Sequence, residues 1–448
     1  MSPALRARAP AFGPSTVSME LPPAARRASA QRWPANIRRA LVASVRASPA
    51  APAEPSLASL VAACDPGRLA DLAISEGLAG PALEKLGGLL PPGPVARLAG
   101  EARRDAVRHL AYLGVLRKLA VALDRAGVTW VALKGPVLAD LSYRDVPRGY
   151  ADLDLMVDPG QLRRALNALE RAGAVVAEDD WPLLISSAKG QLSMTVHGLP
   201  MVDLHWHLVY LRSARDRWAI PTDDLLARRQ RVRLKGVDAW SLDPYDFVAH
   251  LALHASFGAV QQLRRLLDIE RTVASRPPDW EVLVQRCRAW RVGLPVSVML
   301  NRARQTLGAA VPEGVVEELA GTRLNRLVVR QLGAWSPAGR MPAGRSVKNG
   351  LTRSLRDSLP ATAGEFAGQT RQAFTQLLGV RAAPLDKPGS MDEPEVPDGL
   401  ESYLDLAESA DRYGHLKSAE NLPPRRRPRA LRRVRKLSET RSAWLGPD

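Results

Sequence analysis

Residues 131–158 read VALKGPVLADLSYRDVPRGYADLDLMVD, and residues 201–208 read MVDLHWHL. The first stretch is predicted to contain a short apolar strand with Asp152 and Asp154 two residues apart, and the second an apolar strand with Asp203. Residues two apart in a strand project from the same face, so the two carboxylates of the first stretch are expected to point the same way. Carboxylates are the ligands that Mg²⁺ prefers, and the three acids together predict a site for one or two metal ions in phosphoryl transfer.

A strand followed by a glycine turn precedes the two acids. The apolar run from Val128 to Leu133 predicts a strand that ends at Lys134-Gly135, and a helix is expected over Pro136–Leu141 because proline fits a first helical turn. Gly135 permits a tight turn and close approach of a ligand to the backbone, and a new helix N-terminus is a place for phosphate. Lys134 is expected either to offset phosphate charge or to face a structural carboxylate.

These segments resemble the uncharacterised nucleotidyltransferase family within the polymerase-β-like superfamily. The resemblance extends over about residues 60–319 and is strongest over 128–268. The matching segments are LKG at 133–135, the block with Tyr143, Arg148, Asp152 and Asp154, VDLHW at 202–206, HLALH at 250–254 and LRRLLDI at 263–269.

The resemblance implies a small mixed sheet, an Mg²⁺-dependent site, and transfer of a nucleoside monophosphate from an NTP such as ATP. It implies that Asp152, Asp154 and Asp203 are catalytic metal ligands. Lys134, Gly135 and Arg148 are the predicted phosphate contacts, and for Arg148 the resemblance favours this role over a surface ion pair with Asp140 or Asp145. One departure concerns phosphate binding. Many superfamily members carry Gly-Gly or Gly-Ser after the first strand, whereas this chain has Lys134-Gly135-Pro136 and so lacks a serine hydroxyl that would contact phosphate.

Periodicity and composition predict an α+β protein with the small mixed sheet between helical regions. Leucines at helical spacing, ended by Gly127, predict helices before the first strand. Asp243-Pro244 predicts a helix start, and helical periodicity follows it. The expected divisions are a disordered basic N-terminal segment at 1–56, a helical domain at 57–127, a nucleotidyltransferase-like core at 128–242, a C-terminal helical domain at 243–335, and a largely disordered charged tail at 336–448.

The formal net charge of +17 says little about the substrate, because residues 1–56 contribute +6 and residues 336–448 contribute +5. The basic run at 425–436 lacks interleaved aromatic residues, so no specific nucleic-acid partner is expected. Two distant cysteines and the absence of a run long enough to span a bilayer favour a cytoplasmic protein without a membrane span.

Two alternatives stand beside nucleotidyl transfer. Asp203, His205 and His207 alternate along one strand, and His250 and His254 share a helix face, which is a set suited to zinc in a hydrolase. That set lacks the glutamate base of a zinc protease and leaves the Asp-x-Asp pair unused, which favours His205 and His254 as hydrogen-bonding residues near the acids.

The second alternative is a catalytically silent nucleotide-binding or scaffold module, or an antitoxin-like interaction module. Clustered carboxylates argue against a silent module, because a scaffold does not need them. For the enzyme, the acceptor is an unknown hydroxyl-bearing small molecule, peptide or protein, and a protein partner is compatible with the sequence.

Overall fold

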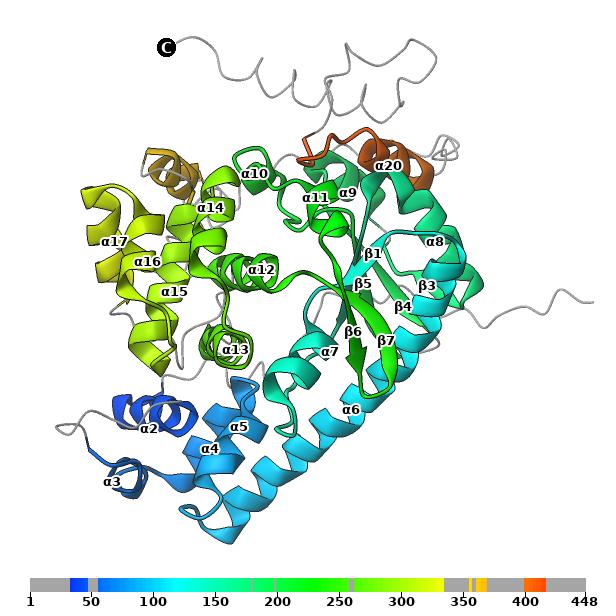
Figure 1. Cartoon of the computed structure of the whole chain (residues 1–448). Helices are drawn as coiled ribbons and strands as arrows, with labels where there is room; N and C mark the ends of the chain where they lie inside the picture. Colours follow the sequence, from blue (N-terminus) through cyan, green and yellow to red (C-terminus); the bar gives the residue numbers. More distant parts are fainter. Residues whose placement is uncertain are drawn as a thin grey trace, which may run out of the picture.

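The computed structural model describes residues 33–46, 55–178, 180–196, 199–257, 262–333, 354–356, 360–368 and 399–415. Within them the chain forms one mixed seven-stranded sheet surrounded by helices (Figure 1). The expected α+β class is therefore confirmed. A continuous buried apolar cluster reaches from Trp33 to Ala407, so the described segments at both ends contribute to the core.

The sheet has the order β3-β4-β5-β2-β1-β7-β6. The β1–β7 and β2–β5 pairs are parallel, and the other four pairs are antiparallel. Strand β2 is buried along its whole length, which fits its central place and its apolar sequence. The strands are β1 Trp130–Ala132, β2 Leu153–Val157, β3 Ala174–Val176, β4 Gln191–Val196, β5 Leu199–His205, β6 Gln230–Leu234 and β7 Val237–Ser241.

The 34-residue helix α6, Pro92–Arg125, runs alongside the sheet and packs on β7 and on α8, Leu162–Arg171 (Figure 1). Its buried face includes Tyr112, Leu116, Leu119 and Leu123, at the three- and four-residue spacings of one helix face. Gly127 follows the helix with a φ of 64°, so the expected glycine ending is confirmed.

Four helices pack together at the N-terminal end of α6: α2 Ala35–Val45, α3 Leu57–Ala62, α4 Pro66–Ser75 and α5 Ala79–Leu86. The expectation of disorder over 1–56 is wrong for residues 35–45, which form α2. Ile37, Leu41 and Val45 recur every four residues and are buried, so this short basic helix has an apolar face that packs. Residues 1–32 and 47–54 lie outside the described residues.

The expected C-terminal helical region is present. Helix α15, Gly293–Leu307, packs against α12, Pro244–Phe257, and α13, Gln262–Ser275. The side chain of Asp243 accepts hydrogen bonds from the backbone N–H groups of Tyr245 and Asp246, which confirms the predicted start of α12. The remaining helices of this region are α14 Trp280–Ala289, α16 Glu313–Ala320 and α17 Arg323–Gly333.

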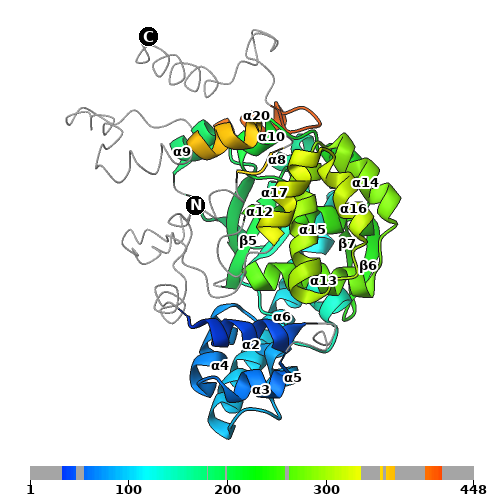
Figure 2. The same ribbon diagram turned by 90° about the vertical axis from the view of Figure 1, so that its left-hand side faces the viewer.

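Residues 399–415, called here the C-terminal strap, return to the sheet. The strap contains α20, Gly399–Glu408, which packs on α8 and on α9, Trp181–Ser187, far from the N-terminal helices (Figures 1 and 2). The expected disordered tail is wrong for this segment, because Tyr403, Leu404 and Ala407 form a buried apolar face among the acids. The basic run at 425–436 lies outside the described residues. No helix in the described part has the length and apolarity to cross a bilayer.

Candidate active site

The parallel pairing of β2 with β5 places Asp154 directly beside Asp203. Both side chains are buried, and His205 shares the face of Asp203 because it lies two residues further along β5. One ligand atom from each of Asp154, Asp203 and His205 can be chosen so that all three lie within 4.8 Å of one another. The structure therefore brings two of the three predicted acids together, whereas their catalytic roles stay a prediction.

The two carboxylate oxygens of Asp154 have different surroundings. Its Oδ1 lies 3.1 Å from Lys134 Nζ and 3.1 Å from His205 Nε2. Its Oδ2 is buried and has no hydrogen-bond partner among the described residues. Burial opposes ionisation of Asp154, but the Lys134 ammonium and His205 outweigh that effect and hold its pKa below the usual range. Asp154 is therefore an ionised carboxylate with one oxygen free to take a ligand.

Asp203 is held by two side chains from the neighbouring strand β4. Ser193 Oγ donates to its Oδ1 at 3.0 Å, and Gln191 Nε2 donates to its Oδ2 at 3.1 Å. Burial raises the pKa of Asp203, although its neighbours His205 and Ser193 favour the ionised form. Sequence reasoning missed Ser193 and Gln191. Their signal was their alternation along β4, which places both on the face of the sheet that Asp203 occupies.

Asp152 immediately precedes β2 and is half-buried. Burial, together with the negative charge of Asp154, raises its pKa to about 6, although Lys134 and Arg264 favour the ionised form. The two acids of the Asp-x-Asp pair are therefore shifted in opposite directions. Asp152 exchanges a proton near pH 6, while Asp154 remains ionised there.

The Lys134-Gly135 turn lies against the start of β2. The backbone N–H of Leu133 donates to Asp154 O at 3.1 Å, and Gly135 has a φ of 24°. A Cβ atom on Gly135 would lie 3.2 Å from the ring of Tyr150 and 3.3 Å from Asp152 O, so the close approach requires glycine. The expected helical segment Pro136–Leu141 is confirmed: α7, Gly135–Leu138, continues as a π-helix over Ala139–Tyr143.

His250 and His254 lie on α12, with their ring centroids 6.2 Å apart. His254 Nδ1 lies 3.5 Å from Lys134 Nζ. Burial, assisted by the Lys134 charge, lowers the pKa of His250 to about 3 and that of His254 well below its usual range, so both rings are neutral at pH 7. The expectation that His205 and His254 make hydrogen bonds beside the acids is confirmed.

The proposed zinc set does not assemble in the described part of the chain. Strand β5 ends at His205, so His207 no longer continues the alternation. His207 Nδ1 accepts from the N–H of Val209 at 3.0 Å, and its Nε2 donates to Ile220 O at 3.2 Å. Both ring nitrogens are therefore used in fixing the loop after β5, away from the group of Asp154, Asp203 and His205.

Arg148 is buried, and its guanidinium faces Asp268 of α13. Its Nε lies 2.7 Å from Asp268 Oδ1 and its Nη2 lies 2.8 Å from Oδ2, in a bidentate ion pair. Burial opposes its charge, but Asp268 outweighs this and raises the pKa of Arg148. The Tyr143 hydroxyl also donates to Asp268, at 2.8 Å. The structure thus places two of the arginine nitrogens on a carboxylate, and a phosphate contact by Arg148 stays a prediction.

Two further arginines of α13 lie beside the acids, and the sequence had given them no role. Arg264 Nη1 donates to Gly149 O at 2.9 Å, and Arg265 Nη1 donates to His254 O at 3.0 Å. Burial lowers the pKa of both groups, to about 10 for Arg265, and both guanidinium groups interact with the charge of Asp152. With Lys134 they bring positive charge to the same place as the carboxylates.

Comparison with known proteins gives one family and one distant structural likeness. A family model described as uncharacterised nucleotidyltransferase matches residues 62–308. None of the curated proteins compared with the chain matches it. The solution structure of the antibiotic-resistance factor ANT(2'')-Ia is similar over 40% of this chain and 92% of that chain, with 13% sequence identity and a TM-score of 0.29. So distant a likeness supports no argument about substrate or mechanism.

Proposed function

The chain belongs to the uncharacterised nucleotidyltransferase family, whose model covers more than half of it, and on this premise we propose an Mg²⁺-dependent reaction. In this reaction a nucleoside monophosphate moves from an NTP, such as ATP, to a hydroxyl-bearing acceptor. One observation carries the proposal: two buried carboxylates, Asp154 and Asp203, lie side by side on paired strands together with His205.

The donor set fits a hard divalent cation. Mg²⁺ takes oxygen ligands and is commonly held by one or two carboxylates together with substrate phosphates. The unpartnered Oδ2 of Asp154 is the buried polar atom that such an ion would satisfy, and Asp203 and Asp152 would hold it as well. When bound, the metal would neutralise the negative charge that develops on the phosphate oxygens.

The positively charged residues of the site would bind the triphosphate. Lys134 balances the charge of Asp154 at 3.1 Å, and its ammonium has further donors for phosphate oxygens. Arg264 and Arg265 supply guanidinium groups beside Asp152. Gly135 lets the turn pack closely against Tyr150, because a side chain there would meet that ring, and we propose that its backbone meets the phosphates. Lysine, arginine and backbone groups would therefore bind the phosphates, in place of the serine hydroxyl that this chain lacks after its first strand.

Asp203 would orient the acceptor and accept its proton. Its raised pKa makes it a stronger base than an exposed aspartate, and Ser193 and Gln191 fix both of its oxygens in direction. The neutral rings of His250 and His254 add no positive charge that would depress that basicity. General base catalysis by this carboxylate is the role we propose for it.

Calorimetric titration with ATP and the other three NTPs, with Mg²⁺ and with EDTA, tests this function. We expect the wild type to bind at least one NTP in an Mg²⁺-dependent manner, and Asp154→Asn and Asp203→Asn to weaken that binding by at least about tenfold, since each removes a ligand charge but keeps its shape. Asp145→Asn, at an exposed loop carboxylate, is the matched control and should bind like wild type. A wild type that binds no NTP with Mg²⁺ present would refute the proposal.

A further inference from the structure

Tyr403 of the C-terminal strap is fully buried, and its hydroxyl joins strands β4 and β5 beside the candidate site. Trp206 Nε1 donates to this hydroxyl at 3.0 Å, and the hydroxyl lies 2.7 Å from Lys189 O and 3.0 Å from Gln191 O. A hydroxyl has one hydrogen, so it donates to one carbonyl while it accepts from the indole. Tyr403 thereby connects the start of β4 with the residue that follows β5.

Both of these attachment points lie next to site residues. Gln191, the first residue of β4, pairs with His205 and sends its side-chain amide to Asp203 Oδ2 at 3.1 Å. Trp206 directly follows His205. The backbone that Tyr403 fixes is therefore the backbone that aims Gln191 at Asp203, and a movement at this point would be transmitted to the carboxylate.

Further contacts hold the strap in place on both sides of Tyr403. On α20, Glu401, Asp405 and Glu408 all pair with Arg163 of α8. Near the end of the strap, Arg215 Nε donates to Gly414 O at 3.3 Å. The strap is thus attached along its length, with ion pairs at the surface and hydrogen bonds in the interior.

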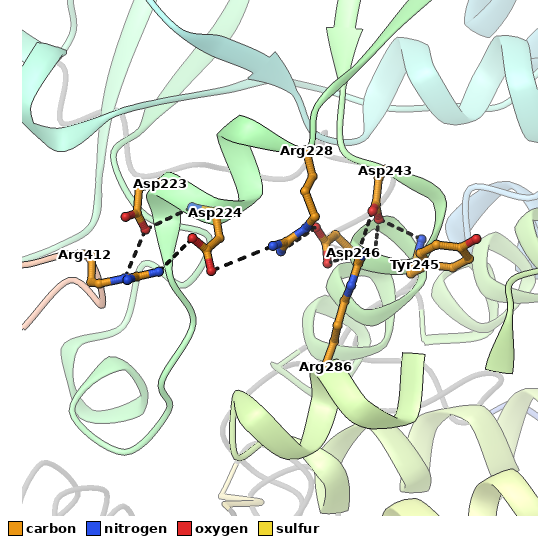
Figure 3. A network of polar contacts seen from close by, with 8 residues as sticks. All are labelled: Asp223, Asp224, Arg228, Asp243, Tyr245, Asp246, Arg286 and Arg412. Carbon is orange, nitrogen blue, oxygen red and sulfur yellow. Dashed lines mark hydrogen bonds and ion pairs between the residues drawn. The ribbon is translucent and has the colours of Figure 1, made fainter. Parts of the chain in front are cut away.

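A row of ion pairs links the strap to α12, the helix that carries His250 and His254. Arg412 pairs with Asp224 of α11, Thr222–Ala227, and a row of ion pairs continues from there to the first turn of α12 (Figure 3). In order, the row runs through Arg412, Asp224, Arg228, Asp246 and Arg286, and the Asp246 carboxylate is fully buried. The strap therefore lies against the sheet side of the candidate site and is linked through this row of ion pairs to the start of α12.

We infer that the C-terminal strap is a structural part of the candidate active site, and that Tyr403 is a positioning residue that acts on Asp203 through Gln191. This inference rests on the proposed function. Loss of the hydroxyl leaves the Trp206 N–H and the carbonyls of Lys189 and Gln191 without that partner, and it frees the start of β4 to shift. Metal ligands tolerate little such freedom, because a displacement of about 1 Å is enough to spoil a binding geometry.

The test uses Tyr403→Phe in the full chain, with MgATP binding measured by calorimetry and the apparent Mg²⁺ affinity measured at fixed ATP. We expect the Kd for MgATP to rise by about three- to thirtyfold and the apparent Mg²⁺ affinity to fall, as is usual when a residue that orients a metal ligand is lost. Tyr413→Phe is the matched control. Tyr413 lies in the same strap, its hydroxyl bonds to none of the described residues, and its loss should leave both values within about twofold of wild type.

A double-mutant cycle with Gln191→Ala examines the route. If Tyr403 acts through the Gln191 side chain, Tyr403→Phe adds little to the defect of Gln191→Ala. Arg163→Gln, which removes only surface anchors of α20, should weaken MgATP binding in the same direction and covers the case in which Tyr403→Phe does not fold.

Three results would overturn the inference. Tyr403→Phe could lower Tm yet leave MgATP and Mg²⁺ binding unchanged, or its effect could add fully to that of Gln191→Ala. A wild type that binds none of the four NTPs in the presence of Mg²⁺ would instead overturn the proposed function and this inference with it. Unchanged binding by the variant, beside clear binding by the wild type, overturns this inference alone.

Discussion

Replacing Asp152 with asparagine should make the metal-free protein more stable. Burial and the charge of Asp154 raise the pKa of Asp152 from its ordinary value of 3.8 to about 6. Each unit of such a shift corresponds to about 1.4 kcal/mol, so keeping this side chain ionised at pH 8 costs about 3 kcal/mol of the free energy of unfolding. Asparagine has the same shape without the charge. We therefore expect Asp152→Asn to gain up to about 3 kcal/mol at pH 8.

The gain should depend on pH in a defined direction. A group whose pKa is raised by folding contributes stability below its unfolded pKa and loses that contribution as the pH rises through its folded pKa. For Asp152 this window runs from about 4 to about 6. The advantage of Asp152→Asn should therefore fall to about half at pH 5 and approach zero below about pH 4.

Urea unfolding in EDTA at pH 5 and pH 8, followed by tryptophan fluorescence, measures this difference, and the buried Trp130 of β1 reports on the sheet. Asp145→Asn at an exposed position is the control and should change stability at neither pH. If Asp152→Asn were less stable than wild type at pH 8, or if its gain were equal at both pH values, the electrostatic reasoning would be refuted.

Two further predictions concern the charged residues around the acids. Lys134→Met breaks the 3.1 Å pair with Asp154 and should weaken ATP binding in the presence of Mg²⁺ by at least about tenfold. The affinity for Mg²⁺ alone should not fall, because the ammonium that competes with the metal is gone. Calorimetry that found equal losses of ATP and Mg²⁺ affinity would contradict this prediction. Asp268→Ala leaves the buried Arg148 guanidinium without its bidentate partner and should lower the free energy of unfolding, measured in urea, by about 3–5 kcal/mol. A decrease below about 1 kcal/mol would contradict the role of this buried ion pair.

The sequence predicted the central part of the fold because its signals there are local. Alternation placed Asp154 and Asp203 on strands, and the structure pairs these two residues directly. The glycine after α6 and the aspartate before α12 also ended and began helices where expected, since capping depends on a few neighbouring residues. Patterns of this kind need no knowledge of distant contacts.

Distant contacts account for what the sequence did not predict. Arg148 and Asp268 are 120 residues apart, and no local pattern distinguishes an arginine that meets phosphate from one that meets a buried carboxylate. The helices α2 and α20 lie in segments whose overall composition favours disorder, and their short apolar faces gain stability only from the surfaces that they cover. Only the folded arrangement shows that Tyr403 supports Gln191.

The place of β1 in the sheet has a consequence for the order in which the chain folds during synthesis. Strand β1 pairs with β2 on one side and with β7 on the other, where Ala132 meets Ser241. Five adjacent strands, β3-β4-β5-β2-β1, are complete once residue 205 has left the ribosome, whereas β7 and α12 follow later. Pairings between distant residues form slowly, and N-terminal segments emerge first. The strands that carry the acids are therefore synthesised before the histidines of α12 and before the C-terminal strap, so we expect the site to be complete only when these later segments have packed on the sheet.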